Sequence, residues 1–152
     1  MSLSTDQYVQ AQLAELVWQE GRDFSLNVMV AMLLVQANRI RAGWCEGSWL
    51  KLVQEQKQQW TWLAQEFRSI RYTTQPDLRD PLFQAVLIET ESVYNGGADH
   101  LTDGAIWYCP QAAVDNKISG WFVNNILDNP AQHLRTAAIG GMVFYSGGQN
   151  AC

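Results

Sequence analysis

The segment LAELVWQEGRDF places one carboxylate, that of Glu20, where a run of apolar residues ends. The apolar residues before it recur at the spacing of one helix face, at Val9, Leu13, Leu16 and Val17. Glu20 continues this series, and Gly21 follows as a helix stop. Partial burial and the negative end of a helix dipole both disfavour the charged form of a carboxylate there. The position favours a neutral acid that can donate a proton in catalysis. The alternative is a partly exposed glutamate at a frayed helix end.

Helices that would position this carboxylate are predicted over the first two-thirds of the chain. They cover residues 5–19, 24–41, 46–72 (one broken helix or two shorter ones) and about 81–94. The second is apolar nearly all round, which is typical of a buried central helix. Short strands are predicted at 104–109 and 142–146, and the turn-rich stretch between them has one short helix near 121–127. We therefore expect one mainly helical α+β domain over residues 1–152, with a small β element late in the chain.

The composition excludes several classes of protein. With 152 residues and 47% hydrophobic residues, the chain is long and apolar enough for one packed core. A net charge of −5 without a basic cluster argues against a nucleic-acid surface. The longest strictly apolar run, residues 28–35, is too short to span a bilayer, so no stable membrane insertion is expected. The N-terminal stretch MSLSTDQYVQAQ shows no secretory signal.

The three cysteines, Cys45, Cys109 and Cys152, are an odd number without metal-ligand spacing. Structural or free thiols are expected, with no zinc site, no cofactor and no disulfide essential to the fold.

Four short motifs, in the same order along the chain, carry a resemblance to a known family. Glu20 is followed by an apolar helix and then by Asn38-Arg39-Ile40, as in an E-A-x-G-E context followed by N-R-V. QQWT at 58–61 stands where the family has G-Q-F-S. LTDGAIWY at 101–108 is similar to D-P-T-x-G-A-L-Y-Y, and IGGMVFY at 139–145 is similar to I-G-N-H-x-F-Y. Over nearly its whole length the chain resembles the SleB-type cell wall hydrolases.

The resemblance implies a lysozyme-like fold that cleaves peptidoglycan between N-acetylmuramic acid and N-acetylglucosamine. Glu20 would be the general acid and base of a lytic transglycosylase, a reaction for which one carboxylate is enough. A muramidase-type hydrolysis would use a second carboxylate, for which Asp23, Glu89, Glu91 and Asp103 are available. The partners would be peptidoglycan glycan strands. Because no signal is visible, we expect a phage-encoded lysin that acts at the bacterial cell wall, or a protein that is cytoplasmic until it is released.

The chain also departs from the family pattern. Gly21 replaces the usual Ala, and Asp23-Phe24 replaces a Gly-Glu pair. His100 stands where the family usually has Asp, and Met142 stands where it usually has His. These changes leave open a second interpretation, a catalytically inactive glycan-binding or structural relative with the same fold.

Six further residues are candidates for holding the glycan. Seven Trp residues offer flat apolar faces, and Trp107 and Tyr108 could stack on sugar or pack the core. Thr102 and Asp103 could bind substrate or only shape a turn. Gln59 could reach a sugar hydroxyl or simply be solvated. Tyr145 could contact Glu20 or the reacting sugar, or it could pack on the core. Asn38 and Arg39 are predicted to be structural and to tie the central helix to a neighbour.

Overall fold

As predicted, the chain folds as one mainly helical α+β domain with a small β element late in the sequence. The structure shows this element to be a three-stranded antiparallel sheet. The computed structural model describes residues 4–67, 74–116, 122–148 and Cys152, with only the backbone of 60–67. The helical elements are α1 (Thr5–Gly21), α2 (Leu26–Arg41), η1 (Trp44–Gly47), α3 (Trp49–Phe67), α4 (Pro81–Tyr94), α5 (Gln111–Asp115) and η2 (Val123–Leu127). The strands are β1 (Trp107–Pro110), β2 (Arg135–Ile139) and β3 (Met142–Tyr145).

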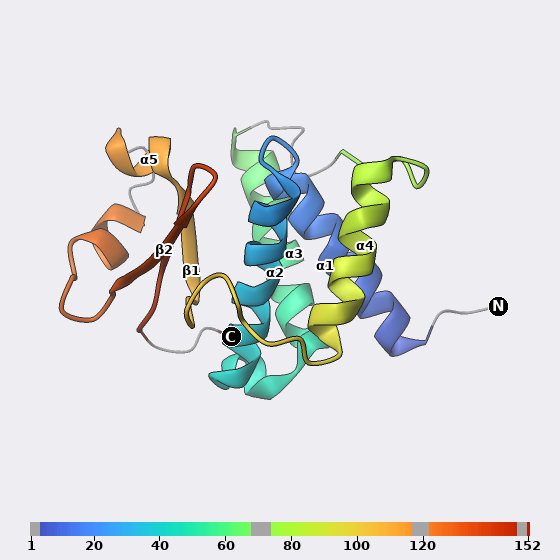
Figure 1. Ribbon diagram of the computed structural model, residues 1–152, viewed down its shortest axis with the longest axis horizontal. Coiled ribbons are helices and arrows are strands. Elements are labelled where there is room, and N and C mark those ends of the chain that lie inside the picture. Colours follow the sequence, from blue (N-terminus) through green and yellow to red (C-terminus); the bar gives the residue numbers. More distant parts are fainter. Residues whose placement is uncertain (1–3, 68–73, 117–121, 149–151) are drawn as a thin grey trace.

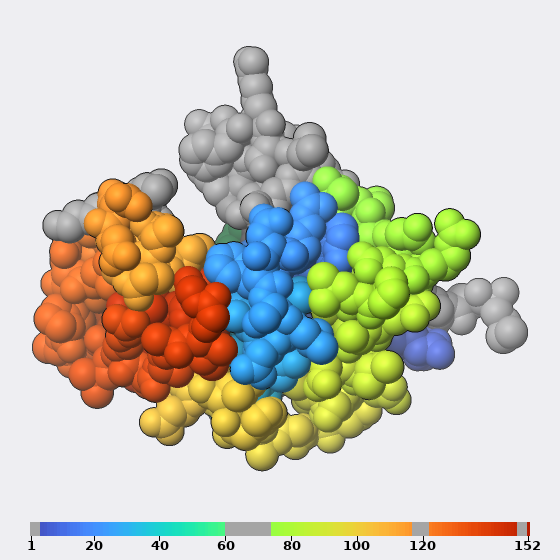
Figure 2. Space-filling model, turned by 45° about the horizontal axis from the view of Figure 1, so that its top comes forward, coloured from blue at the N-terminus to red at the C-terminus, as the bar shows by residue number. Residues whose placement is uncertain are grey.

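Helix α2 forms the centre of the domain, as its apolar composition predicts. Every residue from Val28 to Asn38 is buried. The sheet lies on one side of α2, and α1 and α4 lie on the other (Figure 1). The same order is visible at the surface, where α2 separates the sheet from α4 (Figure 2). Within the described residues, no helix combines the length and the apolar composition needed to cross a bilayer.

The sheet has the order β1-β3-β2, with β3 in the middle. Met142 and Phe144 of β3 pack on the helices, while Val143 and Tyr145 pack in a second cluster with Phe122. Both faces of β3 are thus covered, and all four of its residues are buried. The alternation follows from the two-residue side-chain period of a strand.

Strand β2 and helix α5 were not predicted from the sequence. β2 has the sequence RTAAI, in which Ile139 is the only large apolar residue, and its burial does not alternate strictly along the strand. Gly140 and Gly141 connect it to β3, with φ values of 52° and 89°. Two consecutive residues with positive φ are typical of a tight hairpin turn, which glycine forms without steric cost. The Gly-Gly pair was therefore the local signal for this hairpin.

The end of α1 packs very closely on α2. A Cβ atom added to Gly21 would lie 2.5 Å from Met29 Cγ and 3.1 Å from Met32 Sδ. The absence of a side chain at this position therefore allows the last turn of α1, with Glu20, to approach α2. This contact gives a physical reason for a residue without a side chain at position 21.

A disulfide joins Cys45 to Cys152, whose Cα atoms are 4.9 Å apart, and Cys109 is a buried free thiol. The expectation of free thiols is thus wrong for Cys45 and Cys152. The pair is separated by 107 residues in the sequence, and only the tertiary structure brings the two sulfurs together. That the fold does not require this bond stays a prediction.

Substituting Gly21 by Ala is expected to destabilise the domain. Overpacking at Met29 should lower the free energy of unfolding by about 1–3 kcal/mol, against a helix-propensity gain of up to about 1 kcal/mol. Urea unfolding followed by circular dichroism measures the difference. In a Met29→Ala background the space is open, so the same change should cost clearly less. If Gly21→Ala lowers the free energy of unfolding equally in the parent and in the Met29→Ala protein, the close contact with Met29 is not the cause of the loss.

The Cys152→Ser variant is expected to lose stability but to remain folded. Removing a disulfide of this span should lower the free energy of unfolding by about 2–4 kcal/mol. The far-UV circular dichroism at 25 °C should not change, because neither cysteine belongs to the main core around α2. Reducing the parent protein should reproduce the variant, and adding reductant to the variant should change nothing further. Loss of the helical signal would show that the bond is essential to the fold.

Candidate functional site

Glu20 is the penultimate residue of α1 and is half-buried. The residues of the predicted apolar stripe are all buried, with exposed fractions of 1–4%: Val9, Leu13, Leu16 and Val17. Glu20 therefore lies at the edge of this face, between the core and the surface. The prediction that it lies within one turn of the helix end is confirmed. That it also lines a cleft beside the late strands stays a prediction.

Two ionisable groups from other elements lie near the Glu20 carboxylate. Burial lowers the pKa of Arg39, at the end of α2, while the charges of Tyr108 and Glu20 oppose this shift. Burial raises the pKa of the Cys109 thiol, in β1, to about 11, and the Glu20 charge adds to this increase. Glu20 thus lies where the end of α1 meets α2 and β1. Among the described carboxylates, only Glu20 influences both groups.

The Arg39 guanidinium is packed against two tryptophan rings. Its central carbon lies 4.6 Å from the ring centre of Trp44 and 5.6 Å from that of Trp107. The two rings are 5.1 Å apart in an edge-to-face arrangement. Trp107 is held in place by a 2.8 Å hydrogen bond from its indole N–H to the Gly147 carbonyl. Trp44, Arg39 and Trp107 are called the arginine–tryptophan cluster below.

Two consecutive side chains at the end of α2 connect this helix to the segment that leads into β1. Asn38 Nδ2 donates to the Ala105 carbonyl at 2.9 Å, and Arg39 Nε donates to the Ile106 carbonyl at 2.8 Å. Both residues therefore have the structural role that was predicted for them. They also determine where β1, and hence Trp107 and Tyr108, lies relative to Glu20.

Asn38 also binds the turn that precedes β1, which is organised by Asp99. The Asp99 carboxylate accepts hydrogen bonds from Asn38 Nδ2 at 2.9 Å, Thr102 Oγ1 at 2.6 Å and Gly104 N at 2.8 Å. Burial raises the pKa of Asp99, but hydrogen bonds from Thr102, Asn38 and Gly104 have the larger combined effect and hold it well below its usual value. The side chain of Thr102 is fully buried in this network. Shaping the turn is therefore the role that its contacts support.

The other predicted substrate-binding residues are spread over several surfaces. Tyr108 is half-buried near Arg39, and its ring centre lies 6.1 Å from that of Phe144. Tyr145 packs on Phe122 in the second cluster, and burial raises its pKa. Asp103 is exposed with a φ of 52°, and Gln59 is exposed on α3. The structure thus brings only Trp107 and Tyr108 into the neighbourhood of Arg39.

Met142 and His100, which the motif comparison singled out, have different surroundings. Met142 is 1% exposed and belongs to the main core, so it packs as an apolar residue between sheet and helices. His100 is exposed, and its Nδ1 lies 3.2 Å from the carbonyl oxygen of Ala98 in its own turn.

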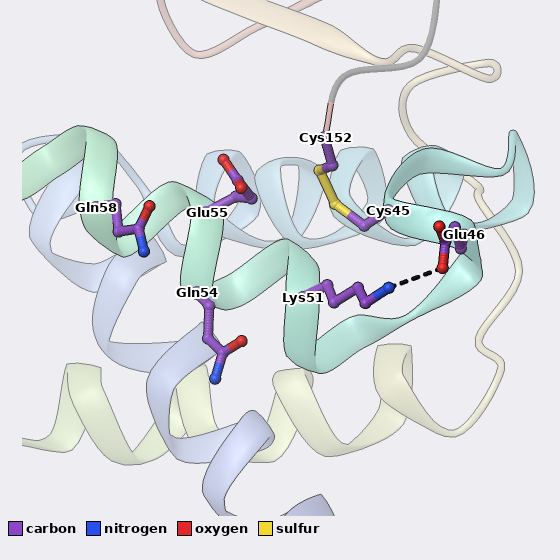
Figure 3. Close-up of a pocket in the computed structure, with 7 residues that line it drawn as sticks. All are labelled: Cys45, Glu46, Lys51, Gln54, Glu55, Gln58 and Cys152. Atoms are coloured by element: carbon purple, nitrogen blue, oxygen red, sulfur yellow. Dashed lines mark hydrogen bonds and ion pairs between the residues drawn. A yellow bond between two sulfur atoms is a disulfide. The ribbon is translucent and has the colours of Figure 1, made fainter.

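A polar pocket of about 280 Å³ lies apart from Glu20, beside the disulfide. Figure 3 shows its wall on η1 and the first half of α3, with Lys51 and Glu46 joined by a 2.7 Å ion pair. The residues that line it are Cys45, Glu46, Lys51, Gln54, Glu55, Gln58 and Cys152. None of the predicted site residues is among them.

No protein-family model, no curated protein and no solved structure matches this chain.

Sequence reasoning missed the cluster around Arg39. Trp44 was not singled out, Arg39 was assigned only a structural role, and Cys109 was considered only as a thiol. Gln36 and Gln56 were also missed, although both are buried polar residues on α2 and α3. A glutamine within the apolar stretch of α2 was the available signal, because a buried polar side chain requires a partner.

The Asp99→Asn variant should show a pH-dependent loss of stability. Because the folded-state pKa of Asp99 is depressed, the carboxylate stabilises the fold above its unfolded-state pKa of about 4, and this contribution is lost as the pH falls further. At pH 7 the variant should be less stable by about 1–2 kcal/mol, allowing for partial exposure. Urea unfolding at pH 7 and pH 3 should show the gap closing at the lower pH. Asp103→Asn, at an exposed neighbour, is the control and should show no such dependence.

Proposed function

We propose that this chain has a lysozyme-like fold and cleaves the glycan strands of peptidoglycan, with Glu20 as general acid and base. The observation that carries this proposal is the half-buried Glu20 at the end of α1, beside α2 and the strand β1. A carboxyl group partly removed from water is suited to exchanging a proton with substrate. The motif resemblance to SleB-type cell wall hydrolases gives the substrate class, the bond between N-acetylmuramic acid and N-acetylglucosamine.

In the proposed reaction Glu20 acts twice. It first donates its proton to the glycosidic oxygen, and the bond between this oxygen and the anomeric carbon breaks. The resulting carboxylate then accepts the proton of the muramyl 6-hydroxyl, whose oxygen bonds to the anomeric carbon. The product is a 1,6-anhydromuramyl end, and Glu20 regains its proton. These two steps make up a lytic transglycosylation, which consumes no water.

A one-carboxylate mechanism fits the positions of the other acidic residues. Asp23, Glu91 and Asp103 are exposed. Glu89 is half-buried on α4, which lies on the opposite side of α2 from the sheet (Figure 1). Hydrolysis with two carboxylates requires both groups on one substrate site, at roughly 5–10 Å from each other. A one-carboxylate reaction requires none of these residues at a fixed distance from Glu20, so transglycosylation is the form of the reaction that we propose.

A non-catalytic glycan-binding protein is the second candidate. The observation that favours it is Met142, a fully packed core residue where the similar family has a histidine. Trp107 would serve either function, because an indole face stacks on sugar whether or not the sugar is cleaved.

The Glu20→Gln variant separates the two candidates. It preserves the shape of the side chain and removes the transferable proton, so lysis of permeabilised cells should slow by about 100-fold or more. The melting temperature should change little. Asp103→Asn is the matched control and should lyse at nearly the parent rate.

The reaction products identify the mechanism. Mass spectrometry of digested peptidoglycan should show 1,6-anhydromuramyl ends. Reducing ends would instead indicate hydrolysis, and equal damage from Asp103→Asn in a folded protein would indicate a second catalytic carboxylate. If Glu20→Gln lyses cells as fast as the parent, Glu20 is not the acid. If purified parent protein releases no product, the chain is the glycan-binding relative.

A further inference from the structure

Arg39 brings a positive charge into the interior beside the proposed acid. The residue is half-buried in the last turn of α2, with its guanidinium between the edge-to-face rings of Trp44 and Trp107. Taking a cation out of water is costly unless it gains other interactions. The two aromatic faces supply one such interaction, since each attracts a cation electrostatically.

Hydrogen bonds fix the orientation of the guanidinium. Nε donates to the Ile106 carbonyl at 2.8 Å, and Nη1 donates to Gln36 Oε1 at 3.3 Å. Gln36 is 1% exposed, and the same oxygen also accepts from the Gln56 side chain, so it is held from both sides. The guanidinium therefore has one orientation, and it is set before any ligand binds.

The arginine–tryptophan cluster has more hydrogen-bond donors than acceptors. Arg39 has five N–H groups, and among the described residues its Nη2 donates to none. No described carboxylate lies within ion-pair distance of its nitrogens. The indole N–H of Trp44 is buried and also has no acceptor in the described part of the chain. A ligand that meets Arg39 Nη2 must be an acceptor, and the cationic guanidinium favours one with negative charge.

We propose that Arg39 binds a carboxylate of the muramyl unit and so makes the site select muramic-acid glycans over glycans of N-acetylglucosamine alone. The muramyl unit carries such a carboxylate on its lactyl group when unsubstituted, and on the attached peptide when substituted. Arginine suits this role because its planar fork matches a carboxylate, and a stacked, pre-oriented fork loses little freedom on binding. The inference rests on the proposed function for its substrate class, but it concerns selection and not cleavage.

The test measures binding of three glycans of equal length to the Glu20→Gln protein by calorimetry. The first alternates N-acetylglucosamine with unsubstituted N-acetylmuramic acid, the second carries peptides on its lactyl groups, and the third is a chitooligosaccharide. At least one of the first two should bind about 10- to 100-fold more tightly than the third, the range of a charge-assisted hydrogen bond. Tighter binding of the first glycan would identify the lactyl carboxylate as the group that Arg39 binds, and tighter binding of the second would identify a peptide carboxylate.

Adding Arg39→Gln to the Glu20→Gln protein should remove this preference, so that all three glycans bind with about equal affinity. The affinity for the chitooligosaccharide should stay within about threefold of its former value. Arg79→Gln, at an exposed arginine in the turn before α4, is the control and should leave the preference unchanged. Arg39→Lys retains the charge without the planar fork, so it should lower the preference at least about threefold. If the Arg39→Gln variant fails to fold, the Arg39→Lys variant alone tests whether the preference depends on Arg39.

Two results would overturn the inference. One is a parent site without preference for the acidic glycans. The other is an Arg39 variant that binds all three glycans more weakly by the same factor, because a purely structural arginine has this effect. The proposed function can fail independently: a protein that cleaves no peptidoglycan but shows the Arg39-dependent preference would refute catalysis alone.

Discussion

The burial of α2 between Val28 and Asn38 is the constraint on which the rest of the structure depends. A polar side chain in this stretch has little access to bulk water, so it must find a partner within the protein. Gln36 and Asn38 are such residues, and the half-buried Arg39 follows them near the end of α2. Their hydrogen bonds to α3, to the Asp99 turn and to the carbonyls before β1 attach the sheet to the helical part.

The same contacts determine the composition of the candidate site. Because Asn38 and Arg39 hold Ala105 and Ile106, the side chains of Trp107 and Tyr108 follow at a fixed place beside the guanidinium. Gly21 lets the last turn of α1 approach Met29 and Met32, which brings Glu20 to this place from the other side. The acid, the cation and the aromatic residues thus come from three separate segments and meet through close packing around one helix. A function that depends on their geometry is therefore sensitive to core packing some distance away.

The disulfide contributes a further link to the arginine–tryptophan cluster. Cys45 follows Trp44 directly in η1, and Cys152 lies five positions after Gly147, the residue whose carbonyl holds the Trp107 indole. The cross-link thus ties together two segments that hold the tryptophans on Arg39. Its effect on stability and its effect on the cluster are separable in principle, because the helical core around α1, α2 and α4 does not include either cysteine.

The sequence by itself determined the local features of this protein. Apolar spacing showed the stripe on α1 and the burial of α2, and Asp80-Pro81 marked the start of α4, because each depends on residues within a few turns. The tertiary structure decided which predicted residues meet. Thr102 joined the Asp99 network and Tyr145 packed in the second cluster, whereas Trp44 and Trp107 came together on Arg39. Neither the Cys45–Cys152 pairing nor the Arg39 surroundings could be predicted, because they depend on distances between segments far apart in the chain, and spacing along the chain carries no information about such distances.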